Sequence, residues 1–367
     1  MRNAILIDSQ DGMDAAVFRL HAATRLALDT EFMRERTYYA KLCLVQLATD
    51  NDCFLIDPLA GLDLAGLFDL LMDPGKPKIL HAARQDLEIL FQAAGRVPAP
   101  IFDTQLAAAM LGYPGQAGYA DLVASELGHS IDKGQTRTDW SRRPLSDPQL
   151  AYAADDVHHL LELHTRLSNR LEEAGRSEWL LEEAGAYADA GLYQTDPADA
   201  WRRVKGFARL QPVEQNRVRA LAQWRERRAI DSDKPRGWIL KDAALLDLGT
   251  RQPRTVEELE QMSSLPAGLV RRRGNELLDV LDRAQASPSG EAVVPLPGKP
   301  TAEEMKLTAR LMQVVREVAT SQGITPEVLA TRRDIEALAR GAEDSALLRG
   351  WRARVIGEKL SATLRAP

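Results

Sequence analysis

Two acidic residues at the end of a strand-like segment carry the clearest chemical signal of the sequence. Asp29 and Glu31 close the run LALDTEF, and side chains two positions apart on a strand point to the same face of a sheet. Two anions held this close repel each other, and one of them keeps a proton unless a cation lies between them. A hard divalent cation such as Mg²⁺ or Mn²⁺ prefers such oxygen ligands. The alternative is an exposed strand end whose acids are solvated.

Three further residues could join this pair. Asp86 lies in HAARQDL, where a helix is expected to follow the strand-like KILH. Taken alone, it would be an ordinary acid that interacts favourably with the N-terminal end of the helix dipole. Tyr152 and Asp156 are four residues apart and therefore share one face of a helix. A tyrosine beside a metal-binding carboxylate can orient an attacking water, whereas the alternative is a tyrosine packed on the core next to solvated acids.

The cysteines and the adjacent histidines do not indicate a zinc site. Cys43 and Cys53 are the two cysteines of the chain and cannot by themselves supply a structural zinc site or a disulfide framework. We therefore expect a reducing, cytoplasmic environment. His158 and His159 follow Asp156 closely, but adjacent side chains on a helix diverge. We interpret these two histidines as surface or packing residues and not as zinc ligands.

Taken together, the acidic positions resemble a known set of motifs. Asp29-x-Glu31, Asp86 and Tyr152-x-x-x-Asp156 are similar to the three motifs of the DEDD exonuclease superfamily in its tyrosine branch. The histidine branch would place histidine at position 151, which is Ala151 here. The surrounding segments resemble the bacterial ribonuclease D family along nearly the whole chain, as in LDTEFMRERTYYAKLCLVQL, FLIDPL, ILHAARQDLEIL, IFDTQLAAAMLGY and TDWSRRPL.

The resemblance implies a metal-dependent 3′→5′ exoribonuclease that trims RNA precursors, chiefly tRNA, at single-stranded 3′ ends and releases 5′-mononucleotides. It also implies two divalent ions, Mg²⁺ or Mn²⁺, held by Asp29, Glu31, Asp86 and Asp156. Two such ions about 4 Å apart activate a water and stabilise the leaving oxygen. Tyr152 would position that water, because a phenol with an ordinary pKa near 10 stays protonated at neutral pH.

Residues near these motifs are candidates for substrate contacts. Phe32 and Met33 follow Glu31 directly and could wedge against the terminal bases, although such residues are more often part of a core. Lys133 and Arg142 precede the last motif and could contact phosphates. The alternative is that both cations belong to a solvated charge cluster, which the sequence does not distinguish from phosphate-binding residues.

Charge is distributed unevenly between the two halves of the chain. Residues 1–200 contain 17 Lys and Arg against 31 Asp and Glu, whereas residues 201–367 contain 30 against 22. A basic half can bind polyanions, although charges also scatter unevenly by chance. Within this half, Arg271 and Arg272 follow a Pro-Ala-Gly turn that is expected to begin a helix. They could bind phosphate there or form an ordinary solvated basic face.

The first 200 residues alternate between strand-like and helix-like patterns, which favours an α/β layer fold with a mixed sheet. Strands are expected at 25–32, 42–48, 53–56, 78–81 and 101–102, and helices at 15–22, 62–72, 86–94, 104–111, 119–127 and 148–167. The ATDND turn between the second and third strands indicates a hairpin. The resemblance implies that this domain is ribonuclease H-like.

The strand signal ends near residue 200, and the later segments look helical. The stretch SPSGEAVVPLPGKP has the composition of a linker, because proline prevents the continuation of a helix. We predict an exonuclease domain over 1–200, a helical nucleic-acid-binding domain over 205–287, a Pro-rich linker over 288–300 and a second helical domain over 301–367. The resemblance implies that both helical domains are of the helicase-and-RNase-D C-terminal type.

Composition excludes several classes of protein. Hydrophobic residues make up 45% and charged residues 27% of the 367 positions, so the chain is not mainly disordered. No apolar run approaches the about 18 residues of a membrane helix, and the apolar stretch near the N-terminus is too short for a signal peptide. We expect no membrane association and favour a monomer. The alternatives are a DNA 3′→5′ exonuclease with the same site and, with less support, a non-catalytic nucleic-acid-binding protein.

Overall fold

The computed structural model describes residues 4–131, 134, 138–286, 300–342 and 344–366. The chain forms two units, which are described separately. The first contains residues 1–33, 42–193 and 300–367, and the second contains residues 34–41 and 194–299. Among the described residues, no helix has both the length and the apolar character needed to cross a bilayer.

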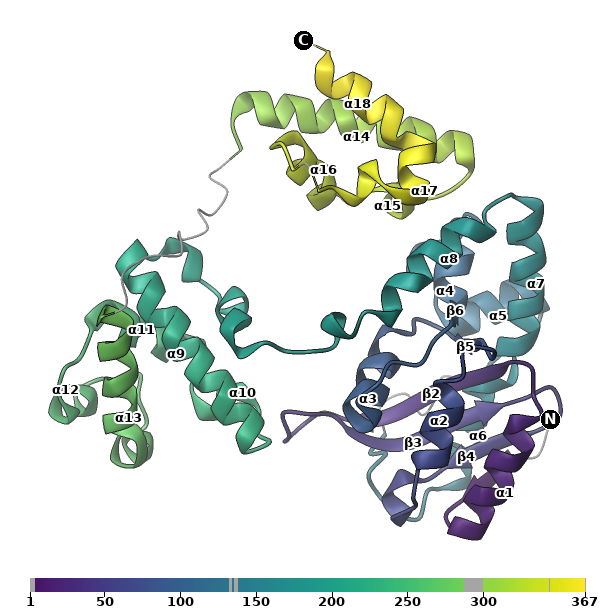
Figure 1. The fold of residues 1–367 in the computed structure, drawn as a ribbon, viewed down its shortest axis with the longest axis horizontal. Helices are drawn as coiled ribbons and strands as arrows, with labels where there is room; N and C mark the ends of the chain where they lie inside the picture. Colours follow the sequence, from purple (N-terminus) through teal and green to yellow (C-terminus); the bar gives the residue numbers. More distant parts are fainter. Residues whose placement is uncertain (1–3, 132–133, 135–137, 287–299, 343, 367) are drawn as a thin grey trace. The chain divides into compact units, whose positions relative to one another are not determined.

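A six-stranded mixed sheet forms the centre of the first unit (Figure 1). Its strands follow the order β1-β4-β3-β2-β5-β6. They are β1 (Ala4–Ile7), β2 (Leu26–Met33), β3 (Lys41–Ala48), β4 (Cys53–Ile56), β5 (Lys78–Leu80) and β6 (Ile101–Asp103). Strands β3 and β4 pair antiparallel, which confirms the predicted hairpin, whereas the pairs β1–β4, β2–β5 and β5–β6 are parallel. The α/β fold with a mixed sheet is confirmed, and β1 is a strand that the sequence pattern did not reveal.

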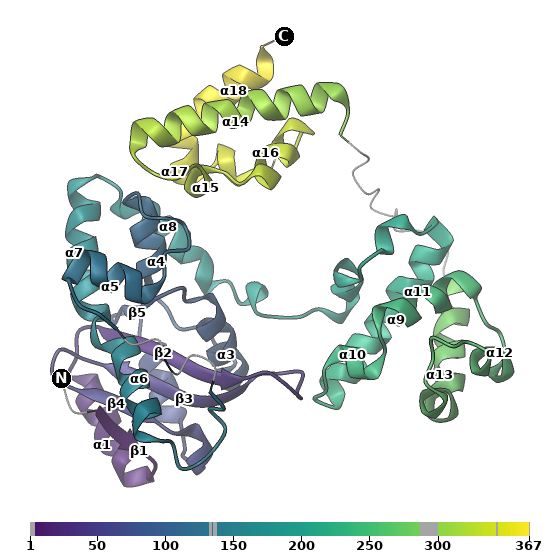
Figure 2. The same ribbon diagram turned by 180° about the vertical axis from the view of Figure 1, so that it is seen from behind.

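Helices cover both faces of this sheet. Helices α1 (Gln10–His21), α2 (Ala65–Leu71) and α3 (Arg84–Ala94) pack on one face (Figure 1), and α6 (Asp147–His158) packs on the other (Figure 2). Side chains along β2 alternate between the two cores. Leu26 and Leu28 belong to the core under α1 to α3, whereas Ala27 belongs to the core under α6.

The predicted helix over 148–167 is wrong in its continuity. Helix α6 ends at His158 and α7 (Leu160–Glu173) begins two residues later, so that His159 lies at the junction. The same part of the unit contains α4 (Thr104–Met110), α5 (Tyr119–Leu127) and α8 (Ser177–Gly185), the last of which was not predicted. Periodicity did not expose the break because leucines continue the apolar pattern across it.

The C-terminal helices share a core with the α/β part of the first unit. They are α14 (Ala302–Gln322), α15 (Pro326–Leu329), α16 (Arg332–Ala339), α17 (Gly350–Arg352), a π-helical turn (Ala353–Gly357) and α18 (Glu358–Arg365). The indole of Trp351 stacks on that of Trp179 from α8, with ring centroids 4.5 Å apart. Trp351 also donates from Nε1 to Glu183 at 2.9 Å. One apolar cluster therefore extends from α4, α5, α7 and α8 into these helices.

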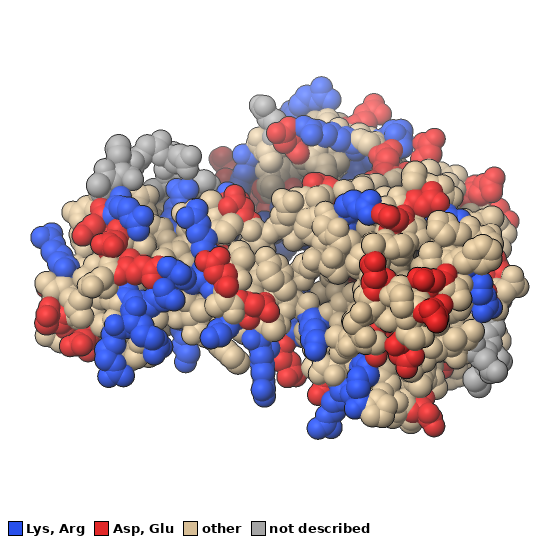
Figure 3. Space-filling model, turned by 60° about the horizontal axis from the view of Figure 1, so that its bottom comes forward, with Lys and Arg blue, Asp and Glu red and all other residues tan. Residues whose placement is uncertain are grey.

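The second unit is helical. It contains α9 (Pro212–Asp231), α10 (Arg236–Ile239), α11 (Asp242–Arg251), α12 (Val256–Glu260) and α13 (Ala267–Ala286) around one apolar core. The segment 34–41 belongs to this unit, where the hydroxyl of Tyr38 donates to the buried Glu226 at 2.7 Å. Lys and Arg side chains are frequent on the face of the unit at the left of Figure 3, interspersed with Asp and Glu. The predicted linker 288–300 lies outside the described residues except for Pro300.

We expect the shared core to make Trp351 a large contributor to stability. Trp351→Ala removes a fully buried indole and should lower the free energy of unfolding by about 3–5 kcal/mol, as measured by urea denaturation. Trp238→Ala is the matched control, because Trp238 is 63% exposed and its loss should change stability by less than about 1 kcal/mol. Equal effects of the two substitutions would contradict the packing described above.

Candidate active site

Three carboxylates from two elements meet at the end of β2. One oxygen from each of Asp29, Glu31 and Asp156 lies within 4.8 Å of the others. Asp29 and Glu31 share the orientation of Ala27 along β2 and therefore face α6, where Asp156 lies in the last turn. The alternation of the strand thus brings together acids that are more than a hundred positions apart in the sequence.

Asp86 reaches the same region from the opposite face of the sheet. Thr30 points away from its two acidic neighbours, and its hydroxyl donates to Oδ1 of Asp86 at 2.6 Å. Asp86 lies in the first turn of α3 and is buried. The start of α3 is held in place by Asp103, whose carboxylate accepts the backbone N–H groups of Ala82 and Ala83, each at 3.0 Å. The fourth acid is therefore oriented by a threonine that the sequence analysis did not single out.

Tyr152 lies one helical turn before Asp156 and forms a hydrogen bond to it. Helix α6 begins with a capping box formed by Ser146 and Gln149, which sets the start of the helix and therefore the direction of both side chains. The Tyr152 ring packs beside the buried Trp140, with centroids 6.0 Å apart. The phenol is thus fixed at its ring while its hydroxyl reaches the acidic cluster.

The pKa values of these acids show that the ionised carboxylates are unfavourable where they are buried close together. Burial, followed by the charges of neighbouring acids, holds the pKa of Asp29 well above its ordinary value and raises that of Glu31 to about 8. Burial likewise raises the pKa of Asp86 to about 6 and that of Asp156 to about 7, although a hydrogen bond from Thr30 or Tyr152 opposes each rise. Among the described residues, the charges that act on these pKa values most strongly are acids and not Lys, Arg or His.

This donor set fits hard divalent cations. Carboxylate oxygens are the ligands that Mg²⁺ and Mn²⁺ prefer, and a cation would stabilise the ionised carboxylates against both burial and their mutual repulsion. Asp29, Glu31 and Asp156 offer ligand atoms close together, and Asp86 lies near enough to act electrostatically on Asp29 and Glu31. The arrangement can bind cations against a polyanionic substrate and can orient a water through Tyr152.

The residues predicted to contact the substrate lie in different environments. Met33 is half-buried and packs against the core under α6, whereas the half-buried Phe32 is not part of that core. Lys133 lies outside the described residues. Arg142 extends into solvent, with an ion pair to Asp139 at 3.7 Å.

Arg271 and Arg272 are exposed on α13 of the second unit, where the guanidinium of Arg272 lies beside Gly268. These two residues belong to the second unit, whereas the four carboxylates belong to the first.

Two positions near the acids show what the sequence pattern could not reveal. The buried hydroxyl of Tyr119 donates to the backbone oxygen of Asp155 at 3.1 Å and accepts the backbone N–H of His159 at 3.3 Å. Burial raises the pKa of this phenol well above 10, so it remains protonated. Arg143 is bound to both carboxylate oxygens of Asp57, which makes it a structural residue rather than a free phosphate ligand. The spacing of residues could not predict either role, because each depends on a partner that lies far away in the sequence.

Two domain families match the chain. A family described as 3′–5′ exonuclease matches residues 4–172, and the HRDC domain family matches residues 214–281. The first match contains all four acids and Tyr152, and the second lies within the helical unit. That residues 301–367 form a second domain of the HRDC type remains a prediction.

Curated relatives resemble the chain along nearly its whole length. It is 40% identical to ribonuclease D of Acidiphilium cryptum, with 96% of this chain and 91% of the relative covered. It is 34% identical to ribonuclease D of a Shewanella species, with 97% and 92% covered. Among solved structures, Escherichia coli RNase D, described as an exoribonuclease involved in structured RNA processing, superposes with a TM-score of 0.90 at 31% identity over 99% of each chain.

The raised pKa values predict an inverse dependence of stability on pH in metal-free protein. These carboxyls hold protons more tightly in the folded protein than in the unfolded chain, where their pKa values are near 4. The folded protein therefore binds more protons between pH 4 and 8, and by linkage the free energy of unfolding falls as pH rises through that window. With EDTA, urea denaturation should show stability about 1 kcal/mol or more lower at pH 8 than at pH 6.

Two variants serve as a matched pair for this measurement. Asp29→Asn removes one interacting charge and should reduce the decline, whereas Asp69→Asn changes an exposed acid of α2 that pairs with Arg96 and should leave the decline unchanged. Addition of Mg²⁺ at pH 8 should restore stability to the wild type more than to Asp29→Asn. A decline that is equal in both variants would show that the cluster is not its source.

Proposed function

The chain belongs to the ribonuclease D family of 3′→5′ exonucleases and is a divalent-metal-dependent exoribonuclease, and we propose on this basis which residues carry the reaction. Asp29, Glu31, Asp86 and Asp156 hold two divalent cations, Mg²⁺ or Mn²⁺. The observation that carries the proposal is the approach of three carboxylates to within 4.8 Å of one another in the part of the chain that matches the exonuclease family.

Bound divalent cations supply an activated water and stabilise the departing 3′-oxygen of an RNA phosphodiester. The chain's own residues prepare this chemistry. Tyr152 directs its hydroxyl toward the water, while Thr30 fixes the Asp86 carboxylate. Hydrolysis at the terminal phosphodiester needs no covalent intermediate and releases 5′-mononucleotides.

The proposed substrates are RNA precursors with single-stranded 3′ ends, chiefly tRNA. The support is that Escherichia coli RNase D, a relative over its whole length, is described as acting in structured RNA processing. The HRDC-matched unit, in the basic half of the chain, supplies nonspecific phosphate binding, for which the exposed Arg271 and Arg272 are candidates. Phe32 is the candidate that would stack on a terminal base.

RNA is favoured over DNA by the family and not by a residue of the site. Recognition of a 2′-hydroxyl leaves no sequence motif, so the DNA exonuclease alternative is tested by the relative rates on matched RNA and DNA strands. We further propose a cytoplasmic location, in line with the buried thiols Cys43 and Cys53, which form no disulfide, and we propose a monomer. Light scattering of the purified chain tests the monomer.

Substitution of single ligands should abolish activity and leave the fold intact. Asp29→Asn and Asp156→Asn should each lower the rate of mononucleotide release from a 3′-extended tRNA in Mg²⁺ by at least about 10³-fold, because each removes a negatively charged ligand. Asp155→Asn is the control and should keep activity within about threefold. RNA binding without mononucleotide release by the wild type in Mn²⁺ would favour the non-catalytic alternative, and full activity in EDTA would contradict the metal mechanism.

Tyr152→Phe tests the role of the hydroxyl separately from metal binding. The ring and its packing against Trp140 are kept, so we expect kcat to fall by about 10²-fold while the Mg²⁺ concentration for half-maximal activity changes little. Tyr113→Phe is the control, since Tyr113 bonds to Glu126 and not to the acidic cluster. Equal activity of Tyr152→Phe and wild type would remove Tyr152 from the reaction.

A further inference from the structure

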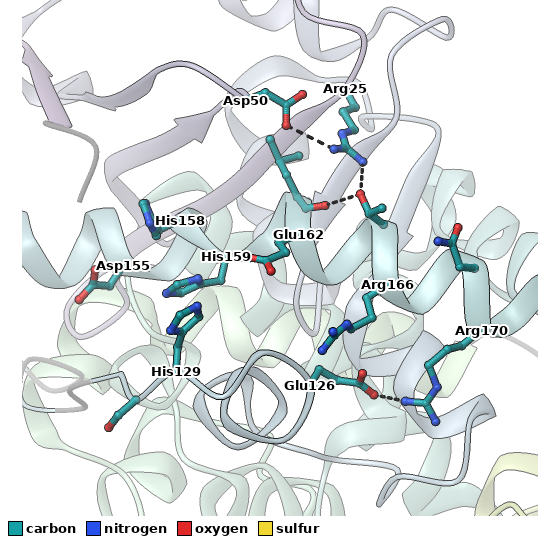
Figure 4. Close-up of a pocket in the computed structure, with 14 residues that line it drawn as sticks. Arg25, Asp50, Glu126, His129, Asp155, His158, His159, Glu162, Arg166 and Arg170 are labelled. Carbon is teal, nitrogen blue, oxygen red and sulfur yellow. Dashed lines mark hydrogen bonds and ion pairs between the residues drawn. The ribbon is translucent and has the colours of Figure 1, made fainter.

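A groove in the first unit is lined by a different set of metal-binding side chains. It has a volume of about 1210 Å³ and runs along α7 and the ends of α5 and α6 (Figure 4). Its histidines and acids include His129, His159 and Glu162. The proposed catalytic ligands Asp29, Glu31, Asp86 and Asp156 do not line this groove.

Three of the lining residues offer ligand atoms close together. One ligand atom from each of His129, His159 and Glu162 lies within 4.8 Å of the others. The imidazole rings of His129 and His159 face each other, with centroids 5.0 Å apart and an angle of 22° between their planes (Figure 4). His158 takes another direction, since its ring stands at 90° to that of His159.

Local backbone structure explains why these residues meet. Helix α5 ends at Leu127, and the positive φ of 73° at the following Gly128 turns the chain so that His129 lies outside the helix. His159 lies in the junction between α6 and α7, and Glu162 follows in the first turn of α7. The break between the two helices, which the sequence did not predict, is therefore what presents His159 to the groove.

We propose that His129, His159 and Glu162 form a binding site for a zinc-class divalent cation that is separate from the catalytic carboxylates. Two imidazoles and one carboxylate suit Zn²⁺ and its neighbours in the transition series, whereas Mg²⁺ prefers oxygen ligands alone. The groove leaves the fourth position open to water. The sequence analysis interpreted His158 and His159 as surface or packing residues because adjacent side chains diverge; the proposed site pairs His159 with His129 and not with His158.

Binding of the ion would bring the three ligand atoms closer together. Tetrahedral zinc with bonds of about 2.0–2.1 Å places its ligand atoms about 3.4 Å apart, whereas here they lie within 4.8 Å of one another. The side chains of His129 and Glu162 are exposed, and His159 is half-buried.

An ion bound at this site would link the junction between α6 and α7 to the segment that follows α5. The same junction is held from the inside, where the backbone N–H of His159 donates to the buried hydroxyl of Tyr119. Because the ion would bind the folded protein and not the unfolded chain, Zn²⁺ should raise the melting temperature. This effect does not depend on catalysis.

The experiment is a Zn²⁺ titration of the full chain against a chromophoric zinc indicator, with millimolar Mg²⁺ present to compete at the carboxylates. Wild type should take up one Zn²⁺ tightly and melt at a higher temperature. His129→Gln and His159→Gln should each weaken this binding at least about tenfold and abolish the rise in melting temperature. His158→Gln is the matched control and should behave as wild type.

Asp29→Asn separates this proposal from the catalytic one, because it should lose exoribonuclease activity and keep the tight Zn²⁺. His129→Gln changes an exposed side chain and therefore keeps the test valid if His159→Gln fails to fold. Zinc affinity that is unchanged in His129→Gln, or that is lost in Asp29→Asn and kept in both histidine variants, would overturn the proposal.

Discussion

Repulsion among carboxylates is the constraint on which the rest of the molecule depends. Four acids are collected at one end of β2, and burial together with their mutual charge makes the fully ionised state unfavourable. A stable core must supply the free energy that holds them there. The central strands of the sheet are buried on both faces, and this packing holds the acidic cluster in a fixed position.

The alternation of side chains along β2 determines how the cluster is assembled. Asp29 and Glu31 face α6 and meet Asp156, whereas Thr30 faces the opposite side and meets Asp86 from α3. Three consecutive residues of β2 therefore contact residues of helices on both faces of the sheet. This explains why the central residue of the motif has a positioning role although it carries no charge.

The sequence predicts those parts of the site that arise from local periodicity, and not those that arise from contacts between residues far apart in the sequence. The common face of Asp29 and Glu31 and the one-turn spacing of Tyr152 and Asp156 follow from the periods of a strand and a helix. The edge strand β1 is defined by its parallel pairing with β4, and the bond of Tyr119 to His159 joins residues that no local pattern relates. The stacking of Trp179 on Trp351 likewise depends on tertiary packing.

The junction between α6 and α7 shows how one break in a helix can serve two surfaces. A continuous helix would have turned its backbone N–H groups into the helix, whereas the break at His159 leaves an N–H that bonds to Tyr119 near the carboxylates. The side chain of the same residue then lies in the groove on the outer side. His159 therefore takes part in two environments through different groups, because its backbone N–H bonds to Tyr119 and its imidazole lines the groove.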